Sequence, residues 1–282
     1  MNIGTSVPLP AYTIDPAFMA KKAEDLGFES IWYAEHAAVP VHSDSPFPAT
    51  GGEIPWTYSH FTDPYIALAR ASGATSKIML GTGITLVPER NPLLLAKEIA
   101  SLDMLSRGRF IFGVGGGWNA EEMGNHGTNF KQRWRILREN ILAMKAIWTE
   151  EESEFHGDHV NFDKMWAYPK PVQRPHPPIL MGGDGPTTFD RVVEYCDGWM
   201  PIGGRGNSGS SLAEKIVLLK KQAEEAGRDP DSLNITSFGI RPDPDLIGRM
   251  SDAGVDRVIF TLPSQERAEV TPLIDECAKL IS

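Results

Sequence analysis

One histidine stands where its ring could exchange a proton with a bound molecule. His36 follows Glu35 at the end of the apolar run Ser30–Ala34, which is typical of a buried β-strand. An imidazole at the end of such a strand can act as an acid or a base near neutral pH. We therefore predict that His36 and Glu35 are catalytic. The alternative is a histidine whose ring is satisfied by a backbone carbonyl, in the core or at the surface.

The other histidines give a weaker signal. The sequence contains neither a His-x-His pair nor an HExxH motif, so a metal-dependent hydrolase is a weaker alternative and no metal site is predicted. Five histidines fall in insertions or loops, where we expect solvation: His42, His60, His126, His156 and His159.

Glycine-rich turns are a second feature that could bind a ligand. Glycine lets the backbone approach a ligand closely and leaves N–H groups free to bind phosphate. Gly113–Trp118 suggests a dinucleotide fingerprint, but GxGxxG requires glycine at position 118, and the run follows the fourth expected strand. We interpret it as a turn at the rim of a barrel, with a tight turn that contacts no ligand as the alternative. The coenzyme-binding candidates in the glycine-rich turns are Gly115, Gly116, Gly117, Trp118, Gly182, Gly183, Gly203, Gly204 and Arg205.

Two of these turns are suited to an anion. Gly182–Gly183 precede a helix that we expect to begin at Gly185–Pro186, and helix N-termini attract phosphate. Gly203–Arg205 follow the next strand and add a fixed cation. The pair predicts a phosphate site, with ordinary helix capping as the alternative.

Short apolar runs alternate with amphipathic segments along the whole chain, and these elements must position the candidates. Asp-Pro or Asn-Pro pairs at residues 15, 63, 91 and 243 mark expected helix starts. About eight strand–helix units predict a (β/α)₈ TIM barrel of the α/β class, whose catalytic groups gather at the carboxyl ends of the strands. An open doubly wound sheet is the alternative. The expected strands span residues 2–7, 30–34, 77–87, 109–114, 178–181, 198–202, 234–238 and 257–262.

Two insertions interrupt this rhythm. The first, after the second strand, spans roughly Val39–Phe61 and carries Phe47, Trp56, Tyr58 and Phe61. These aromatic side chains could roof a planar ligand, or they could pack the loop onto the barrel or form a subunit interface. The second insertion separates the fourth helix from the fifth strand, at about residues 150–177, with a hairpin turn expected at 155–158.

Composition restricts the class of protein. The 282 residues, 41% hydrophobic and 23% charged, fit one globular domain over 1–282. The net charge of −10 argues against nucleic acid as a partner. Neither a signal peptide nor an apolar run long enough for a bilayer is seen, so we expect no membrane partner. Only Cys196 and Cys277 occur, without metal-ligand spacing, and the cytoplasm is the expected compartment.

Several longer motifs together resemble one family. The chain resembles the luciferase-like monooxygenase superfamily (bacterial luciferase-like), and within it the deazaflavin (F420)-dependent oxidoreductase branch, over essentially its whole length. The segments that carry the resemblance are Gly27–Trp32 with Glu35–His36, Leu80–Ile84 with Pro88–Pro92, Leu102–Asp103 with Ser106–Arg109, Gly113–Trp118 with Glu121–Glu122, Tyr168–Gln173 before Ile179, and Asp197–Trp199.

The resemblance implies a coenzyme site. Relatives hold the isoalloxazine-type ring in the barrel mouth over a bulge in the third strand, which corresponds here to Thr82, Gly83 and Ile84 and often includes a non-proline cis peptide, here between Gly83 and Ile84. The position of His36 matches a histidine near the reactive face of the ring. The loops that would hold the coenzyme phosphate match Gly182, Gly183, Gly204 and Arg205.

The same resemblance limits the reaction. Relatives that oxidise sugar phosphates carry a tryptophan four residues after the histidine and a glutamate at the end of the glycine-rich turn, where this chain has Pro40 and Trp118. These departures argue against that mechanism. We expect hydride transfer between coenzyme F420 and a small organic substrate.

Two alternatives stay open. One is a reduced-FMN-dependent two-component monooxygenase supplied by a partner flavin reductase, and the other is a flavin-binding barrel without turnover. Cations at the exit, for which the sequence offers Arg90, Arg205 and Arg241, would favour the acidic tail of F420 over FMN. The family further implies a homodimer.

Overall fold

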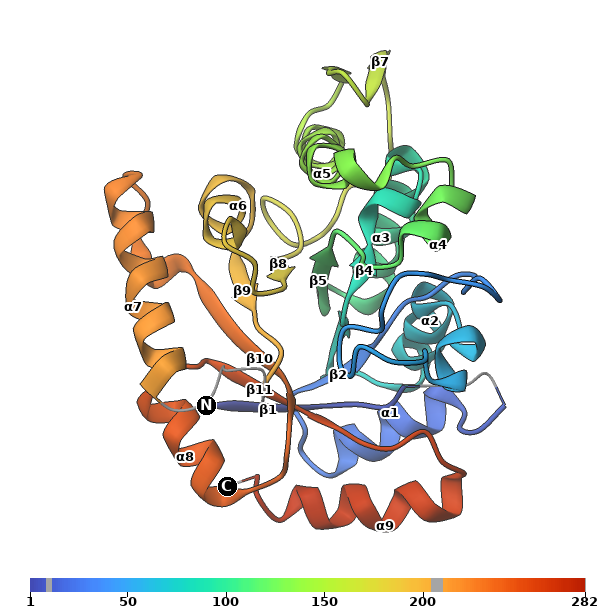
Figure 1. Ribbon diagram of the computed structural model, residues 1–282, viewed down its shortest axis with the longest axis vertical. Helices are drawn as coiled ribbons and strands as arrows, with labels where there is room; N and C mark the ends of the chain where they lie inside the picture. Colours follow the sequence, from blue (N-terminus) through green and yellow to red (C-terminus); the bar gives the residue numbers. More distant parts are fainter. Residues whose placement is uncertain (9–11, 204–209, 282) are drawn as a thin grey trace.

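Eight strand positions close into a parallel barrel in the computed structural model, which describes residues 1–8, 12–203 and 210–281 (Figure 1). The barrel strands are β1 (Asn2–Ser6), β2 (Ser30–Tyr33), β3 (Met79–Thr82), β4 (Thr85–Leu86), β5 (Phe110–Gly115), β8 (Ile179–Gly182), β9 (Gly198–Met200), β10 (Asn234–Ile240) and β11 (Arg257–Thr261). They follow the order β3-β2-β1-β11-β10-β9-β8-β5-β4, and the pairing of β3 with β5 closes the ring. The predicted (β/α)₈ barrel is confirmed, and the open sheet is excluded.

The third barrel position is split, although the sequence predicted one strand over residues 77–87. Gly81 pairs with Ile111 of β5, whereas Thr85 pairs with Val114, so β3–β4 contains one residue more than β5 over this stretch. The extra residue forms the bulge that the family resemblance implied. The peptide bond between Gly83 and Ile84 is cis, as was also expected. An apolar run alone does not show where such a bulge interrupts the pairing.

Helices cover the outside of the barrel (Figure 1). At each of the four predicted helix starts, the side chain of the capping Asp or Asn accepts hydrogen bonds from backbone N–H groups of the first turn, and proline is the first helical residue. The helices are α1 (Pro16–Asp25), α2 (Pro64–Ala74), α3 (Pro92–Ser106), α4 (Ala120–Asn125), α5 (Arg133–Thr149), α6 (Thr188–Tyr195), α7 (Ser210–Glu225), α8 (Pro244–Asp252) and α9 (Arg267–Ala278). Short 3₁₀ turns are η1 (Trp56–His60), η2 (Val87–Glu89), η3 (Phe130–Gln132) and η4 (Pro230–Ser232). None of the helices in the described part of the chain is long and apolar enough to cross a membrane.

A tryptophan and a glycine lie side by side in the barrel interior. Trp32 is fully buried there and packs with Ile111, Leu180 and Ile259. A Cβ atom at Gly81, on the neighbouring strand, would overlap the Trp32 ring. Glycine at this position therefore makes room for the tryptophan, and the interior is filled by side chains rather than open.

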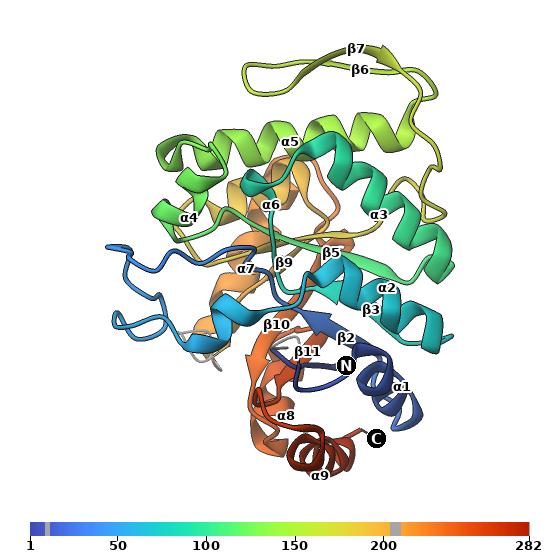
Figure 2. The same ribbon diagram turned by 90° about the vertical axis from the view of Figure 1, so that its right-hand side faces the viewer.

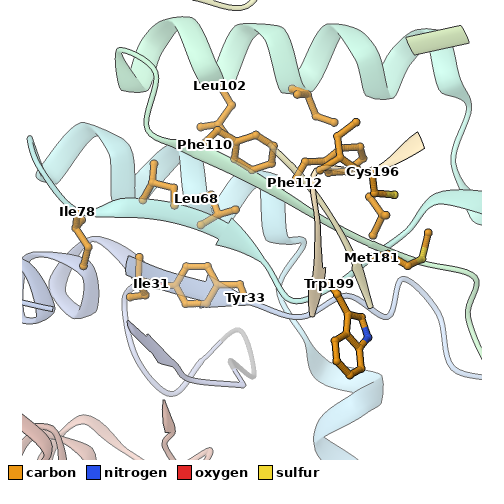
Figure 3. Packing of buried hydrophobic residues seen from close by; sticks show 14 of the residues in the cluster. Ile31, Tyr33, Leu68, Ile78, Leu102, Phe110, Phe112, Met181, Cys196 and Trp199 are labelled. Carbon is orange, nitrogen blue, oxygen red and sulfur yellow. The ribbon is translucent and has the colours of Figure 1, made fainter. Parts of the chain in front are cut away.

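A second apolar layer lies between the strands and the helices. Ile31 and Tyr33 flank Trp32 on β2 but point the other way, as the two-residue period of a strand requires, and they join this outer layer. Figure 3 shows them with Leu68 of α2 and with Phe110, from β5. The two layers fix the strands on both faces, and so fix the loops at their carboxyl ends.

Both predicted insertions are present. The hairpin of β6 (Ser153–His156) and β7 (Asn161–Met165) projects beyond α5, away from the barrel (Figure 2). The insertion after β2 and helix α4 lie together at one end of the barrel in the same view.

Candidate active site

A cavity of about 570 Å³ opens at the carboxyl ends of the barrel strands. This volume lies within the ~300–1,000 Å³ that is usual for small-molecule sites. None of the described residues that line it carries a charged side chain. Those contributed by the ends of the strands are Ser6, Ala34, Gly83, Ile84, Gly182, Gly183, Met200, Ile202, Gly203, Phe238, Gly239 and Thr261.

Aromatic residues of the first insertion form one wall of the cavity. Phe47, Tyr58 and Phe61 line it, with ring centroids 5.0 Å apart for Phe47–Tyr58 and 4.9 Å for Tyr58–Phe61. Trp56 lies outside this group and is 56% exposed. The insertion therefore packs onto the barrel mouth and at the same time covers the cavity.

The bulge at Gly83–Ile84 forms the floor, and nearby glycines make room for it. A Cβ at Gly83 would overlap the Phe238 ring, and a Cβ at Gly115 would overlap the end of the Ile84 side chain. At Gly182 a Cβ would come within 2.9 Å of Ile84 Cγ2. These glycines shape the floor through side-chain packing, a role that the sequence did not reveal.

Thr82 and the Gly115–Trp118 turn lie behind the cavity wall rather than on it. The buried Thr82 hydroxyl donates a hydrogen bond to the Gly113 carbonyl at 2.9 Å. A Cβ at Gly116 would lie 2.7 Å from the Trp134 ring, and Gly117 adopts a φ of +71° that favours glycine. None of these residues lines the cavity, so direct coenzyme contact through them stays a prediction.

Trp118 lies next to the candidate histidine. Its ring packs against Phe47 at 5.8 Å and against His36 at 5.6 Å, between ring centroids. It therefore supports the wall from behind and, like the glycines before it, does not line the cavity.

The predicted anion site is described only in part. Gly182, Gly183 and Gly203 line the cavity, and Gly183 has a φ of +111° with nothing within 4 Å of a Cβ position. This open backbone can approach a ligand. Gly204 and Arg205 lie outside the described residues.

The helix after this turn begins later than expected. The sequence placed its start at Gly185–Pro186, but α6 begins at Thr188. The Thr188 N–H donates to the Gly185 carbonyl at 3.0 Å, and the Gly185 N–H donates to the Thr188 hydroxyl at 3.0 Å. This turn occupies the residues that the Gly-Pro pair was expected to make helical.

His36 forms a buried pair with Glu122. Its Nδ1 lies 2.7 Å from Glu122 Oε2, and the two side chains are 6% and 1% exposed. Glu122 is placed by α4, whose capping residue Asn119 accepts hydrogen bonds from the Glu121 and Glu122 N–H groups. The sequence named Glu35 as the second catalytic candidate and did not reveal the pairing of His36 with Glu122.

His36 approaches the cavity from behind its aromatic wall. Its ring centroid lies 5.0 Å from that of Tyr58 and 6.3 Å from that of Phe61, and both of these residues line the cavity. His36 itself does not line it. The imidazole is therefore next to the ligand space, separated from it by two rings of the insertion.

Glu35 makes a different set of contacts. Its buried carboxylate accepts hydrogen bonds from the Leu86 N–H at 2.6 Å and from Arg90 Nε at 2.5 Å. Arg90 also pairs with Asp63 at 2.6 Å and with Glu98 at 3.3 Å. Burial raises the pKa of Glu35, and the Arg90 guanidinium opposes that rise. The geometry indicates a clamp between β2, β4, α2 and α3, and a catalytic role for Glu35 stays a prediction.

The sequence offered Arg90, Arg205 and Arg241 as cations at the cavity exit. Arg90 is held by three carboxylates, Arg241 is exposed, and Arg205 lies outside the described residues. Arg90 is therefore unsuited to the acidic tail of a deazaflavin.

A further carboxyl group lies near the His36 pair. The side chain of Glu89, at the end of η2, is 3% exposed, and neither of its oxygens has a hydrogen-bond partner. Burial raises the pKa of Glu89 to about 8, and the carboxylates of Glu122 and Glu35 add to that rise. Glu89 and Glu122 both stand in motifs that carried the family resemblance, but nothing in their spacing assigned them a role.

The described residues fit the flavin-type coenzyme that the motifs implied. A planar ring needs an apolar slot with close backbone approach, and the cavity offers the Gly83–Ile84 floor, glycine backbone at the ends of β8 and β9, and aromatic walls. Gly83, Ile84, Gly182, Gly183 and Gly203 are the described candidates that could contact it.

Curated relatives of this chain occur in mycobacteria. An uncharacterised protein of Mycobacterium tuberculosis is 37% identical over 268 residues, which cover 94% of this chain and 93% of the relative. The F420-dependent hydroxymycolic acid dehydrogenase of the same species is 29% identical over 240 residues, which cover 83% of this chain and 61% of that protein.

Solved structures share the fold at low sequence identity. An F420-dependent secondary alcohol dehydrogenase in complex with an F420-acetone adduct gives a TM-score of 0.77 at 20% identity, covering 100% of this chain and 99% of that chain. The monooxygenase RslO1 from Streptomyces bottropensis gives 0.76 at 20% identity, covering 98% of both chains.

The family model described as luciferase-like monooxygenase matches residues 15–241, which include the bulged third strand, the glycine-rich turn and the His36–Glu122 pair. With most of the barrel inside that match and a relative of 37% identity along nearly all of its length, the chain belongs to the luciferase-like monooxygenase family.

Proposed function

We propose that this protein is an F420-dependent oxidoreductase that transfers a hydride between the coenzyme and a small organic substrate. The observation that carries the proposal is the buried His36–Glu122 pair, 2.7 Å apart, beside an apolar cavity at the barrel mouth. The printed names of the mycobacterial dehydrogenase relative and of the secondary alcohol dehydrogenase structure support F420 as the coenzyme.

The pair suits the proton half of such a reaction. When bound, the deazaflavin supplies or accepts the hydride. With Glu122 ionised, His36 Nδ1–H donates to the carboxylate, which leaves Nε2 as the acceptor for a substrate hydroxyl proton. In the reverse direction the imidazolium returns that proton to a carbonyl oxygen. Glu122 fixes the tautomer and stabilises the positive charge.

The same cavity would hold the coenzyme ring and the substrate. The ring would lie over Gly83–Ile84, and the backbone of Gly182, Gly183 and Gly203 would approach its phosphate. Tyr58 and Phe61 stand between His36 and the cavity, so the proposal requires these rings to move aside when the ligands bind.

The cavity lining favours an uncharged substrate. Its described polar side chains are the hydroxyl-bearing Ser6, Thr57, Tyr58 and Thr261. A carboxylate or phosphate on the substrate would lose its hydration there, and the described lining residues offer it no cationic partner. A small apolar alcohol or ketone carries no charge and does not have this desolvation cost. Homodimer assembly stays a prediction from the family resemblance, and a cytoplasmic location stays a prediction from the cysteine usage.

Titration of the purified chain with F420, FMN and reduced FMN, followed by absorbance and fluorescence, tests the coenzyme. Saturable micromolar binding of F420 alone, followed by reduction of F420 with simple secondary alcohols, would support the proposal. Tight binding of reduced FMN alone would replace it with a monooxygenase that depends on a flavin reductase. Binding without any turnover would favour a flavin-binding barrel. If none of the three coenzymes binds, the proposed coenzyme site is wrong.

A further inference from the structure

His36 is shut off from solvent on its cavity side. The rings of Tyr58, Phe61 and Trp118 surround it, and its side chain is 6% exposed. A buried acid or base must regain or release its proton after each turnover. Once substrate fills the cavity, that proton needs a route through the protein.

The opposite side of the pair offers such a route along α4. Glu122 and His126 are four residues apart on this helix and its C-terminal cap, so they lie on one face of it, one turn apart. Glu122 is buried against His36, whereas the His126 side chain is 29% exposed. This helix face therefore leads from the candidate catalytic histidine to the surface.

Glu89 faces this same helix from η2. Its Oε2 lies 3.9 Å from His126 Nε2, and a Cβ at Gly117 would lie 3.4 Å from its Oε1. The backbone of η2 is fixed by two hydrogen bonds, from the Thr128 hydroxyl to the Pro88 carbonyl at 2.7 Å and from the Asn140 amide to the Val87 carbonyl at 3.2 Å. The Glu89 carboxyl group is thus held in place by packing and not by hydrogen bonds of its own.

The charges around Glu89 favour a proton on it. The carboxylates of Glu122 and Glu35 raise its pKa, the cation Arg90 opposes that rise, and the imidazole of His126 lies 3.9 Å away. Arg90 is already bound by Glu35, Asp63 and Glu98. A carboxylate at Glu89 would therefore be buried among like charges with little compensation, which agrees with the direction of its pKa shift.

We propose that Glu89 and His126 form a proton path that connects solvent to the His36–Glu122 pair. This inference rests on the proposed acid–base role of His36. Glu89 and His126 act through the pair and touch neither substrate nor coenzyme, so they are positioning residues.

The proton balance of the path is simple. When His36 Nε2 has taken a proton from the substrate, the proton on Nδ1 passes to Glu122 and on to Glu89, while the proton already on Glu89 leaves to His126 Nε2 and then to solvent. The proton that stays on the imidazole is brought back to Glu122 by rotation of the ring, which leaves the other ring nitrogen free to accept the next proton. In the reverse reaction each O–H or N–H bond forms and breaks in the opposite order. Glu89 makes no hydrogen bond to either neighbour in the structure, so a water molecule or a side-chain rotation must close each gap.

Infrared spectroscopy of the chain without coenzyme tests the first step. We expect a carbonyl stretching band from one protonated carboxyl group at neutral pH, which disappears with a midpoint at a pH of about 8. The band should be absent from the E89Q protein. Absence of any such band from the wild-type protein would overturn the proposal.

Hydrogen–deuterium exchange of that band tests the route. After mixing with D₂O, the band shifts when the carboxyl proton is replaced, and in the H126A protein we expect this shift to be slower by about tenfold or more. Added imidazole should restore the rate, because it can occupy the space left by the side chain. The matched control is H156A, which removes a histidine of the β6–β7 hairpin that is 54% exposed.

Equal exchange in the wild-type, H126A and H156A proteins would show that His126 is not part of the path. This measurement leaves Glu89 unchanged, so it stands even where E89Q fails to fold. Neither readout uses the coenzyme, so a failure of the proposed F420 activity and a failure of the proton path can be told apart.

Discussion

At the scale of single residues, the two buried carboxyl groups of Glu122 and Glu89 differ in their hydrogen bonds. Glu122 is bound by His36 and by the Ala38 N–H, at 2.7 and 3.4 Å, and so is held as an acceptor. Neither oxygen of Glu89 has a hydrogen-bond partner, and burial raises the pKa of Glu89 to about 8. A carboxyl group whose pKa is strongly raised by burial and by charged neighbours is typical of functional sites.

The tautomer argument predicts the effect of changing His36. A glutamine there cannot accept a proton as an imidazole does, so turnover should fall by about 10²–10⁴-fold, while coenzyme affinity stays within a factor of about two. Steady-state kinetics and coenzyme titration of H36Q measure the two effects. The H156Q protein, changed at an exposed hairpin histidine, should keep wild-type kinetics. Loss of coenzyme binding together with turnover in H36Q would contradict a purely chemical role.

Burial of Glu89 predicts a pH-dependent cost in stability. The folded protein keeps the proton up to a pH of about 8, whereas the unfolded chain loses it above the ordinary value of 4.5. The folded state binds more protons in this window, so stability falls as pH rises, by about 1.4 kcal/mol per unit relative to E89Q. Below pH 4.5 the two proteins should differ little, and above pH 8 the difference should level off.

Urea unfolding of both proteins at a series of pH values measures this difference. A constant difference in the free energy of unfolding across the window would mean that Glu89 is ionised in the folded protein. An ionised Glu89 would carry no proton to pass to His126, so that result would also contradict the proton path.

Pairs of elements decide the shape of the cavity floor. Ile84 of the bulge reaches the neighbouring strand, and Gly115 on β5 leaves it room. An added methyl group at position 115 would push Ile84 into the cavity, because it overlaps the end of that side chain. We expect G115A to lose about 1–3 kcal/mol of stability and to weaken coenzyme binding.

A glycine without neighbours gives the control. A Cβ at Gly73 of α2 meets nothing within 4 Å, and alanine favours a helix by about 0.5–1 kcal/mol over glycine. G73A should therefore be as stable as the wild type or more so, with unchanged coenzyme affinity. Thermal unfolding and coenzyme titration of both proteins would show whether the effect at position 115 is specific to the floor.

The same scale shows what the sequence could and could not predict. Capping pairs such as Asp15–Pro16 and Asn91–Pro92 set helix starts locally, and these predictions are confirmed. The Gly185–Pro186 start was wrong because a hydrogen-bonded turn there delays the helix to Thr188. Helix α4 was missed, although Asn119 before an acidic first turn is a capping signal.

The candidate site was predictable only where one segment determines it. His36 was proposed because it sits at the end of a strand, and Gly83–Ile84 because the family resemblance places the bulge of the third strand there. The pairing of His36 with Glu122 was not predicted, because Glu122 is 86 residues away and reaches His36 through packing of α4 beside the insertion. Glu89 was also missed, because its burial without hydrogen-bond partners depends on residues from several distant segments.

At the scale of the whole molecule, the first and last strands pair and close the barrel. β1 pairs with β2 on one side and with β11 on the other, in register from Asn2–Arg257 to Ser6–Thr261. The first and last strands thus form one seam of the ring. The cavity draws on both, through Ser6 and Thr261, and on the insertion between β2 and α2.

Because the first and last strands are neighbours, we expect the chain to tolerate new termini in an exposed loop. A circular permutant that joins residue 282 to residue 1 by a flexible linker and opens at Gly157–Asp158 should fold and bind coenzyme as the wild type does, because the hairpin turn lies away from the cavity (Figure 2). Opening instead at Gly51–Gly52 should leave the barrel intact but loosen the wall of Phe47, Tyr58 and Phe61. We expect coenzyme binding about tenfold weaker in that protein, ~1.4 kcal/mol. Circular dichroism and coenzyme titration distinguish the two, and equal affinities would mean that the insertion contributes nothing to the site.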